Sequence, residues 1–102
     1  MDVQQTTQHN VVTLALSGVF KFDTHREFRA ACSGTLEQPG IEHIIVDLSQ
    51  VTYMDSAALG MLLILRDKAQ SRGTRVSLAR ATNNVRQCIE VSRFDRLFEV
   101  LH

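Results

Sequence analysis

Hydrophobic and polar residues follow one another along the chain in patterns that predict several short strands. Residues 11–18 are rich in β-branched side chains and partly alternate, which predicts a strand that pairs with residues 3–7 and ends at Gly18. Residues 41–48 contain the continuous apolar run Ile44-Ile45-Val46, which is typical of a central strand covered on both faces. Residues 75–79 predict a further short strand.

Helical periodicity occupies the segments between these strands. Thr24 and Glu27 have the spacing of a capping box before residues 24–37, in which apolar side chains recur at helical intervals. A longer helix is expected over residues 56–72, because Asp55 or Ser56 can cap its start and Gly73 follows its end. A third helix is expected to be capped by Asn83 or Asn84, and residues 94–98 predict a last short helical turn.

Strands separated by helices of this length require crossover connections, so the fold class is α/β. We expect a mixed, mostly parallel sheet with an antiparallel N-terminal edge strand, flanked by about four helices. Residues 1–102 are long enough for one domain with a substantial core, and no linker or repeat divides them.

Charge and composition narrow the possible partners. Eleven Lys and Arg balance eleven Asp and Glu, so no broad basic field exists to attract nucleic acid or anionic lipid. The start lacks the features of a signal peptide, and the longest apolar stretch, residues 57–65, is too short to span a bilayer. We therefore expect a cytoplasmic protein without direct membrane insertion, in which Cys32 and Cys88 are buried thiols.

Candidate chemistry gathers where the predicted strands end. The carboxyl ends of strands in an open α/β sheet meet at one edge, which is expected to bring together Asp23, Asp47, Asp55 and Ser56. A hydroxyl in the first turn of a helix faces the positive end of the helix dipole, so Ser56 can carry a phosphate. Composition and spacing favour simpler roles, in which Asp55 or Ser56 caps the helix, Asp23 lies in a turn and Asp47 ends a buried strand.

The helix over residues 56–72 carries more apolar surface than one buried stripe requires. Ala57, Met61 and Ile64 lie on one flank of its core face, and we choose Met61 and Ile64 as the contacts for a partner. The leucines on the other flank are expected to be buried within the domain. No catalytic, cofactor or metal motif accompanies this surface, and His25 is expected to be a solvated histidine rather than a base for Ser56. We expect no enzyme, no cofactor and no metal.

The segment Tyr53-Met54-Asp55-Ser56-Ala57-Ala58-Leu59-Gly60-Met61-Leu62 resembles the STAS domains of bacterial anti-sigma factor antagonists. The hallmark of that family is an Asp-Ser-Ser/Ala-Gly-Leu-Gly segment that opens a helix. The resemblance covers nearly the whole chain, since Phe22-Asp23 and Ile45-Val46-Asp47-Leu48-Ser49 are also similar to family segments. Residues 22–28 and 58–63 look most like a proteobacterial subgroup that regulates motility and biofilm formation.

The resemblance implies a partner switch controlled at Ser56. A Ser/Thr kinase, commonly a kinase-type anti-sigma factor, would phosphorylate Ser56, and a PP2C-like phosphatase would remove the phosphate. The unphosphorylated form would bind and sequester the anti-sigma factor or a similar regulator. Ala57 stands where many members have a second serine, and Ala58 where many have glycine. Two alternatives remain open, namely a constitutive scaffold of a signalling or transport complex and a sensor of a small molecule or nucleotide.

Overall fold

Five strands form one mixed sheet in the order in which they occur in the sequence: β1 Asp2–Gln8, β2 Val11–Phe20, β3 His43–Met54, β4 Arg75–Ala79 and β5 Glu99–Leu101. The computed structural model describes residues 1–101. β1 is antiparallel to β2, and all other neighbours are parallel, as predicted. The helices are α1 His25–Leu36, α2 Ser56–Gln70 and α3 Asn83–Val91, with 3-10 turns η1 Phe22–Thr24 and η2 Phe94–Arg96.

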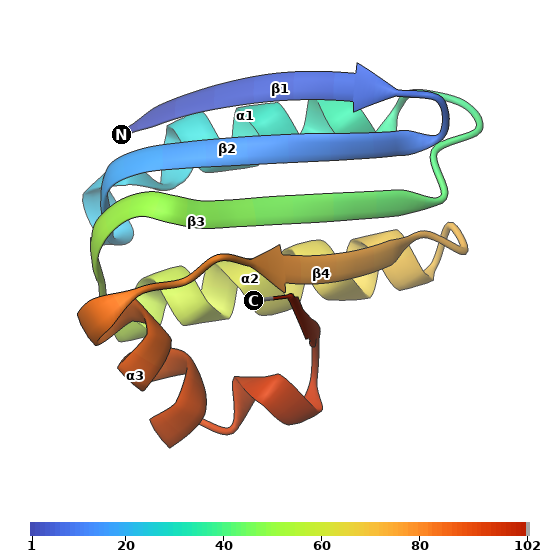
Figure 1. The fold of residues 1–102 in the computed structure, drawn as a ribbon. Coiled ribbons are helices and arrows are strands. Elements are labelled where there is room, and N and C mark those ends of the chain that lie inside the picture. The colour runs from blue at the N-terminus through green and yellow to red at the C-terminus, as the bar shows by residue number, and fades with distance from the viewer. Residues whose placement is uncertain (102) are drawn as a thin grey trace.

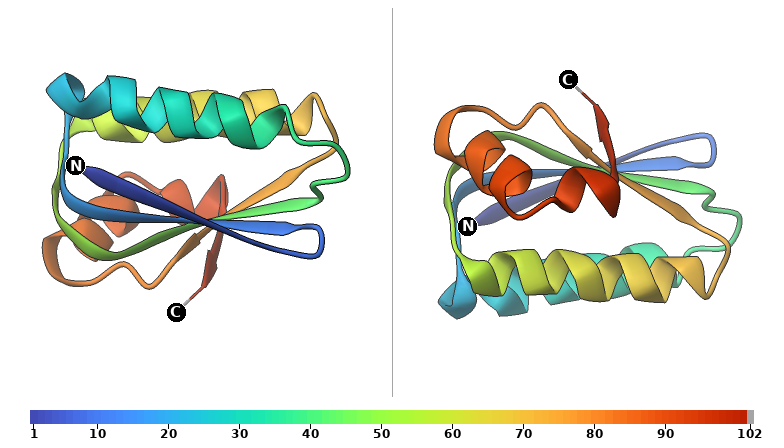
Figure 2. Two further views of the ribbon diagram at one scale, coloured as in Figure 1. Left: turned by 90° about the horizontal axis from the view of Figure 1, so that it is seen from above. Right: turned by 90° about the horizontal axis from the view of Figure 1, so that it is seen from below.

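The helices form two unequal layers on the sheet. α1 and α2 lie side by side behind the strands in Figure 1 and cover one face of the sheet. Figure 2 shows α3 and η2 on the opposite side, where α3 packs against β3. That second layer leaves the part of the face formed by β1 and β2 uncovered (Figure 1). The sheet therefore has one fully covered face and one partly open face.

Alternating side chains of the central strands build the core beneath α1 and α2. Six residues of β2 and β3 on this face are almost completely buried: Val12, Leu14, Leu16, Ile44, Val46 and Leu48. Their neighbours Thr13 and Ile45 point to the other face and stay partly exposed. The prediction that residues 41–48 are covered on both faces is therefore wrong at Ile45, because α3 and η2 cover only part of that side.

Two strands run further than the sequence pattern indicated. Gly18 does not end β2, because the backbone bends there with a φ of +95° and the register with β3 shifts before Val19. Glycine adopts this conformation without steric cost. β3 then pairs with β2 as far as Met54, well past the expected end at Leu48. β5 was not predicted at all, since its three residues carry no recognisable pattern.

Two helix starts differ from the expected caps. Thr82 is the N-cap residue of α3, and Asn83 is the first helical residue, so neither asparagine is the cap. α1 begins at His25 after the 3-10 turn η1, and Thr24 makes no capping hydrogen bond to α1. The prediction of a capping box at Thr24 and Glu27 is wrong, because the turn directs the Thr24 hydroxyl back to the backbone of Lys21. The last predicted turn, at residues 94–98, is confirmed as η2.

Candidate functional site

Ser56 is the first residue of α2, and Asp55 immediately before it is the N-cap. The Asp55 Oδ1 atom accepts a hydrogen bond of 2.9 Å from the backbone N–H of Ala58. This bond satisfies one of the N–H groups that a helix start leaves without a partner. Of the two residues that the sequence offered as caps, Asp55 takes the role. Ser56 is exposed, and its hydroxyl makes no hydrogen bond within residues 1–101.

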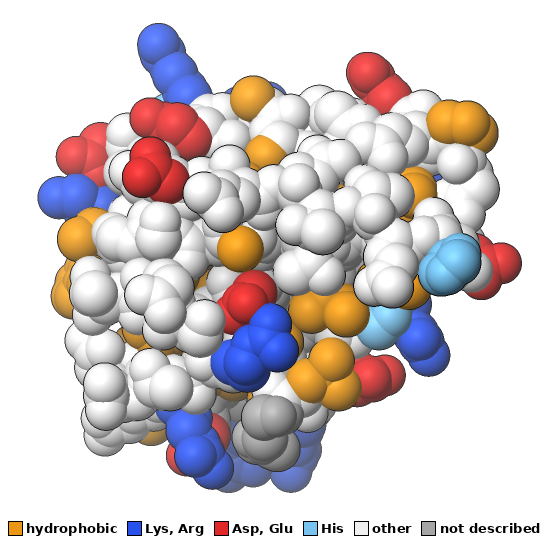
Figure 3. Space-filling view, turned by 45° about the horizontal axis from the view of Figure 1, so that its top comes forward, with side chains coloured by type: hydrophobic (Ala, Val, Ile, Leu, Met, Phe, Trp, Pro, Cys, Tyr) orange, Lys and Arg blue, Asp and Glu red, His pale blue; other side chains and the backbone are white. Residues whose placement is uncertain are grey.

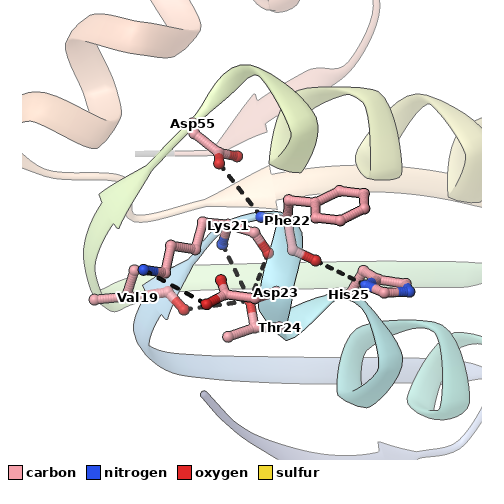
Figure 4. Close-up of polar contacts among 7 residues, drawn as sticks. All are labelled: Val19, Lys21, Phe22, Asp23, Thr24, His25 and Asp55. Atoms are coloured by element: carbon pink, nitrogen blue, oxygen red, sulfur yellow. Dashed lines mark hydrogen bonds and ion pairs between the residues drawn. The ribbon is translucent and has the colours of Figure 1, made fainter.

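Asp55 also connects α2 to the turn before α1. Its second oxygen, Oδ2, accepts a hydrogen bond of 3.3 Å from the backbone N–H of Phe22 (Figure 4). Behind this contact, the Thr24 hydroxyl accepts from the Lys21 N–H at 3.0 Å and donates to the Lys21 carbonyl at 2.8 Å. One carboxylate thereby joins the ends of β2 and β3, and it fixes η1 beside the start of α2.

Phe22 and His25 form a stacked pair next to this contact. The ring centroids are 5.2 Å apart, and Phe22 is 67% exposed. The His25 Nδ1 atom lies 2.7 Å from the Phe22 carbonyl oxygen, which can only accept, so Nδ1 carries the proton (Figure 4). No hydrogen bond joins His25 to Ser56 in the described chain. The arrangement gives His25 a structural role in holding Phe22.

Three exposed hydrophobic side chains surround this end of the sheet, and we call them the apolar rim: Val19, Phe22 and Tyr53. Val19 and Tyr53 are register partners on β2 and β3. Tyr53 precedes Asp55 by two residues, and Phe22 contacts Asp55 through its backbone. None of these three residues was predicted from the sequence as part of the site. For Phe22 and Tyr53 the available signal was their presence in segments that carry the family resemblance, whereas Val19 lies outside those segments.

The predicted acidic residues are only partly brought together. Asp23 lies at the Ser56 end, exposed, and pairs with Lys21 at 3.7 Å, a contact that contributes little in water (Figure 4). Asp47 lies elsewhere, opposite Ala79 in the middle of β3. The expectation that Asp47 ends its strand beside Ser56 is wrong. Because β4 ends at Ala79 while β3 continues with β2, Asp47 marks the end of β4 rather than the end of β3.

Asp47 has its own partners on the open face of the sheet. Its Oδ2 atom lies 2.6 Å from Arg80, and its Oδ1 atom accepts from the Ser49 N–H at 2.9 Å. Burial alone raises the pKa of the Asp47 carboxyl, but the hydrogen bonds from Arg80 and Ser49 outweigh burial and lower it. Both oxygens of the Asp47 carboxylate therefore have structural partners, and the contacts give Asp47 a structural role.

The proposed contact flank of α2 divides into an exposed and a buried part. Ile64 is 54% exposed, Ala57 is half-buried, and Met61 is only 8% exposed. Met61 is therefore wrong as an exposed contact, because α1 packs beside α2 and covers it. Met61 forms the floor of a groove between the two helices that is also lined by Cys32 and Ile64.

The two cysteines are free thiols, but the prediction that both are buried is confirmed only for Cys32. Burial raises the pKa of the Cys32 thiol to about 12, with a smaller opposing effect from Lys68, so Cys32 stays protonated at neutral pH. Cys88 is half-buried, and its thiol lies 3.9 Å from the Met54 carbonyl oxygen. Cys32 packs as a small apolar side chain, and Cys88 links α3 to the end of β3.

A buried histidine and serine lie at the opposite end of the sheet. The His43 Nε2 atom is 2.6 Å from the Ser77 hydroxyl, and its Nδ1 atom is 3.2 Å from Arg75 Nη2. Arginine can only donate, so Nδ1 accepts and Nε2 carries the proton. In this tautomer Nε2 donates to Ser77 and cannot take its proton as a general base. The pair is therefore a structural contact between β3 and β4.

This pair predicts a loss of stability in mild acid. Burial, with a further contribution from Arg75, lowers the pKa of His43 below its ordinary value of 6.5, and the opposing charge of Glu99 does not reverse the shift. The unfolded chain therefore binds a proton before the folded chain does, and the free energy of unfolding falls as the pH drops below 6.5. Urea denaturation above and below this pH should show a smaller loss in H43Q than in the unaltered protein. An equal loss in both would contradict the assignment.

Residues 1–101 contain neither a membrane-spanning helix nor a cluster of metal-binding side chains. None of their helices combines the length and the apolar character that crossing a membrane requires. Within the same residues, His, Cys, Asp and Glu nowhere gather in a group of three or more that could hold a metal ion.

Solved structures that share this fold include anti-sigma factor antagonists. One from Mycobacterium paratuberculosis has a TM-score of 0.86 at 18% identity, and the match covers 98% of this chain and 84% of that one. SpoIIAA of Bacillus in its phosphorylated form gives 0.74 at 19% identity, covering 97% and 90%. Unphosphorylated SpoIIAA gives 0.70 at 20% identity, covering 94% and 97%. At these identities the likeness defines the class of fold, a small mixed α/β domain of the STAS type.

Sequence comparison then identifies the family. The family model described as "Mlab, STAS domain" matches residues 3–101. A STAS-domain containing protein of Pseudomonas aeruginosa (strain UCBPP-PA14) is 39% identical over 89 residues, which are 87% of this chain and 86% of the relative. The chain belongs to the STAS-domain family, which confirms the resemblance found in the segment around Ser56.

Proposed function

We propose that this protein is the antagonist in a phosphorylation-controlled partner switch. The unmodified form binds an anti-sigma factor or a similar regulator through the Ser56 end of the sheet, and phosphorylation of Ser56 releases that partner. The observation that carries the proposal is that two adjacent residues at the start of α2 have different roles. Asp55 caps the helix, which leaves the Ser56 hydroxyl exposed and without a structural bond.

The surroundings of Ser56 suit a binding surface that is sensitive to charge. The apolar rim offers exposed hydrophobic contacts at the same end of the sheet, and Ile64 extends apolar surface along α2. A phosphate on Ser56 adds about −1.5 to −2 charges beside Asp55. A partner that binds by covering the rim would then have to bury this charge or lose its contacts. The dipole of α2 stabilises the same phosphate, so the fold itself stays intact.

The proposal assigns roles to partners as well as residues. A Ser/Thr kinase-type regulator would modify Ser56, and a PP2C-like phosphatase would restore the binding form, both in the cytoplasm. Ala57 has no hydroxyl, so Ser56 is the single acceptor at the helix start. The family membership and the fold shared with SpoIIAA support this mechanism. The chain itself supplies no catalytic group in the proposal, and it needs neither cofactor nor metal.

The test compares partner capture by the unaltered protein, S56A and S56D in extracts of the native host. We expect S56A to retain a regulator that S56D binds at least tenfold more weakly, and mass spectrometry to find phosphate on Ser56 of the unaltered bait. S33D, which adds the same charge at an exposed position on α1, should capture the regulator normally. Measured affinities for the captured regulator then separate a local effect of charge from a general one.

Other outcomes identify the alternatives. Identical partners for all baits, without phosphate on Ser56, would replace the switch with a constitutive scaffold of a signalling or transport complex. Saturable thermal stabilisation by a small anion or nucleotide, lost in S56D, would indicate a sensor that uses the start of α2. Either result overturns the proposed switch.

A further inference from the structure

β1 is an unprotected edge of the sheet. It has one neighbour, β2, and six of its seven residues are exposed. Proteins usually block such an edge with lysine, proline, a bulge or a very short strand, because its free N–H and C=O groups can pair with another chain. β1 has none of these devices. Its seven residues pair with β2 without a register shift, and Val3 to Gln8 carry no charge and no proline.

The other edge of the same sheet is protected. β5 has only three residues, Glu99–Leu101, and the last two of them are partly buried. Just before it, the Arg66 side chain donates a hydrogen bond of 2.8 Å to the Leu97 carbonyl. A strand this short and partly buried offers little to a second chain. The contrast singles out β1 as the edge available for pairing.

We propose that β1 pairs antiparallel with β1 of a second copy of this chain, about a two-fold axis near Gln5. The sequence of the strand is complementary to itself in this arrangement. Gln4 faces Thr6 of the other copy, Gln5 faces its own counterpart, and Asp2 faces Gln8. The single charge in the strand therefore meets a neutral amide beside His9 and not a like charge. Glutamine and threonine side chains can both donate and accept hydrogen bonds across the junction.

The surface next to β1 leaves room for such a neighbour. On the open face, Gln4 and Thr6 lie beside Ala15 and Thr13 of β2, so the middle of the junction carries no charge there. Figure 3 shows that much of this side of the molecule is coloured neither as charged nor as hydrophobic. On the other face, the buried Thr35 hydroxyl of α1 donates to Gln5 Oε1 at 3.2 Å. This bond holds β1 in place, which favours pairing of intact edges over exchange of the strand.

Pairing through β1 leaves the Ser56 end of each copy free. α2 is separated from β1 by α1 in the helical layer (Figure 2), so the second copy does not cover the start of α2. The two-fold axis places the two Ser56 sites at opposite ends of a continuous ten-stranded sheet. A junction of seven residues per strand is small, and interfaces below about 1,200 Å² are usually transient. We therefore expect a reversible, concentration-dependent dimer.

The experiment uses charge at the junction and measures mass in solution. Sedimentation velocity over a range of concentrations should show reversible dimers of the unaltered protein. Q4K/T6K and Q4E/T6E each place like charges opposite one another, because position 4 faces position 6 of the other copy, and should self-associate at least tenfold more weakly. Mixing the two variants should restore dimers, now of mixed composition. Q50K/T52K changes the same residue types at exposed positions of β3 and should dimerise normally.

Three results would contradict a dimer formed through β1. A monomer at every concentration, or dimers of Q4K/T6K as tight as those of the unaltered protein, would overturn the proposal. Failure of the mixed variants to associate, with both folded by circular dichroism, would also reject the antiparallel register. These measurements need no regulator and no phosphate, so they are independent of the proposed switch.

Discussion

The F28A variant is expected to lose about 3–5 kcal/mol of its free energy of unfolding. Phe28 is 1% exposed, and its ring centroid lies 4.9 Å from that of Phe20. It therefore packs α1 against the end of β2, close to the segment that holds η1. Removing the ring leaves a cavity that rigid helix and sheet layers cannot fill. Domains of this size are stable by about 5–15 kcal/mol, so urea denaturation should show a large fall in the midpoint.

A substitution of an exposed hydrophobic residue nearby serves as the control for F28A. Ile64 lies on α2 at the rim of the groove that Phe28 also lines, but more than half of its side chain is in water. I64A should change the free energy of unfolding by no more than about 0.5 kcal/mol. A similar loss in both variants would contradict the placement of Phe28 in the core and Ile64 on the surface.

The D55A variant is expected to lose about 2 kcal/mol, a large effect for one partly exposed side chain. The substitution removes the acceptor for two backbone donors at once, Ala58 in α2 and Phe22 in η1. Water can replace only part of this, because the two groups come from segments that the carboxylate holds together. Thermal and urea denaturation measure the loss.

The D55N variant tests which property of Asp55 matters. Asparagine keeps one oxygen that can accept from Ala58, and asparagine is as good an N-cap as aspartate. We expect D55N to retain the bond within α2, to lose the bond to Phe22 and to fall between D55A and the unaltered protein. Equal loss in D55N and D55A would show that the charge of the carboxylate, and not its two acceptor oxygens, stabilises this end.

The fold could be predicted where local pattern and global topology agree. Long helices with clear starts and stops, such as α2, and the parallel arrangement required by the crossovers are confirmed. The length of β3 could not be predicted, because its second half is specified by pairing with β2 and by the bend at Gly18. The Thr24 capping box failed for a similar reason. Its two residues have the correct spacing, but the chain enters α1 through a 3-10 turn that the spacing does not encode.

The site could be predicted to the extent that it is contiguous in sequence. Asp55 and Ser56 are adjacent. Because α2 begins at Ser56, Asp55 is the N-cap and Ser56 is not. The prediction for Asp47 is wrong because neighbouring strands do not end at the same level: β4 ends at Ala79, opposite Asp47, whereas β3 continues to Met54. The exposure of Phe22 and Tyr53 depends on which parts of the sheet remain uncovered. The role of Ser56 as a phosphorylation site stays a prediction.

The extension of β3 beyond β4 also bears on how this chain avoids aggregation. The segment Leu48-Ser49-Gln50-Val51-Thr52-Tyr53-Met54 is uncharged, lacks proline and favours extended structure, a composition that promotes cross-β assembly when exposed. On the side where β4 has ended, α3 packs against this strand, and Cys88 reaches the Met54 carbonyl. α3 thus covers the part of β3 that has no neighbouring strand on the β4 side. Local unfolding of this short helix would convert a folded domain into a template for aggregation while the rest of the sheet remained intact.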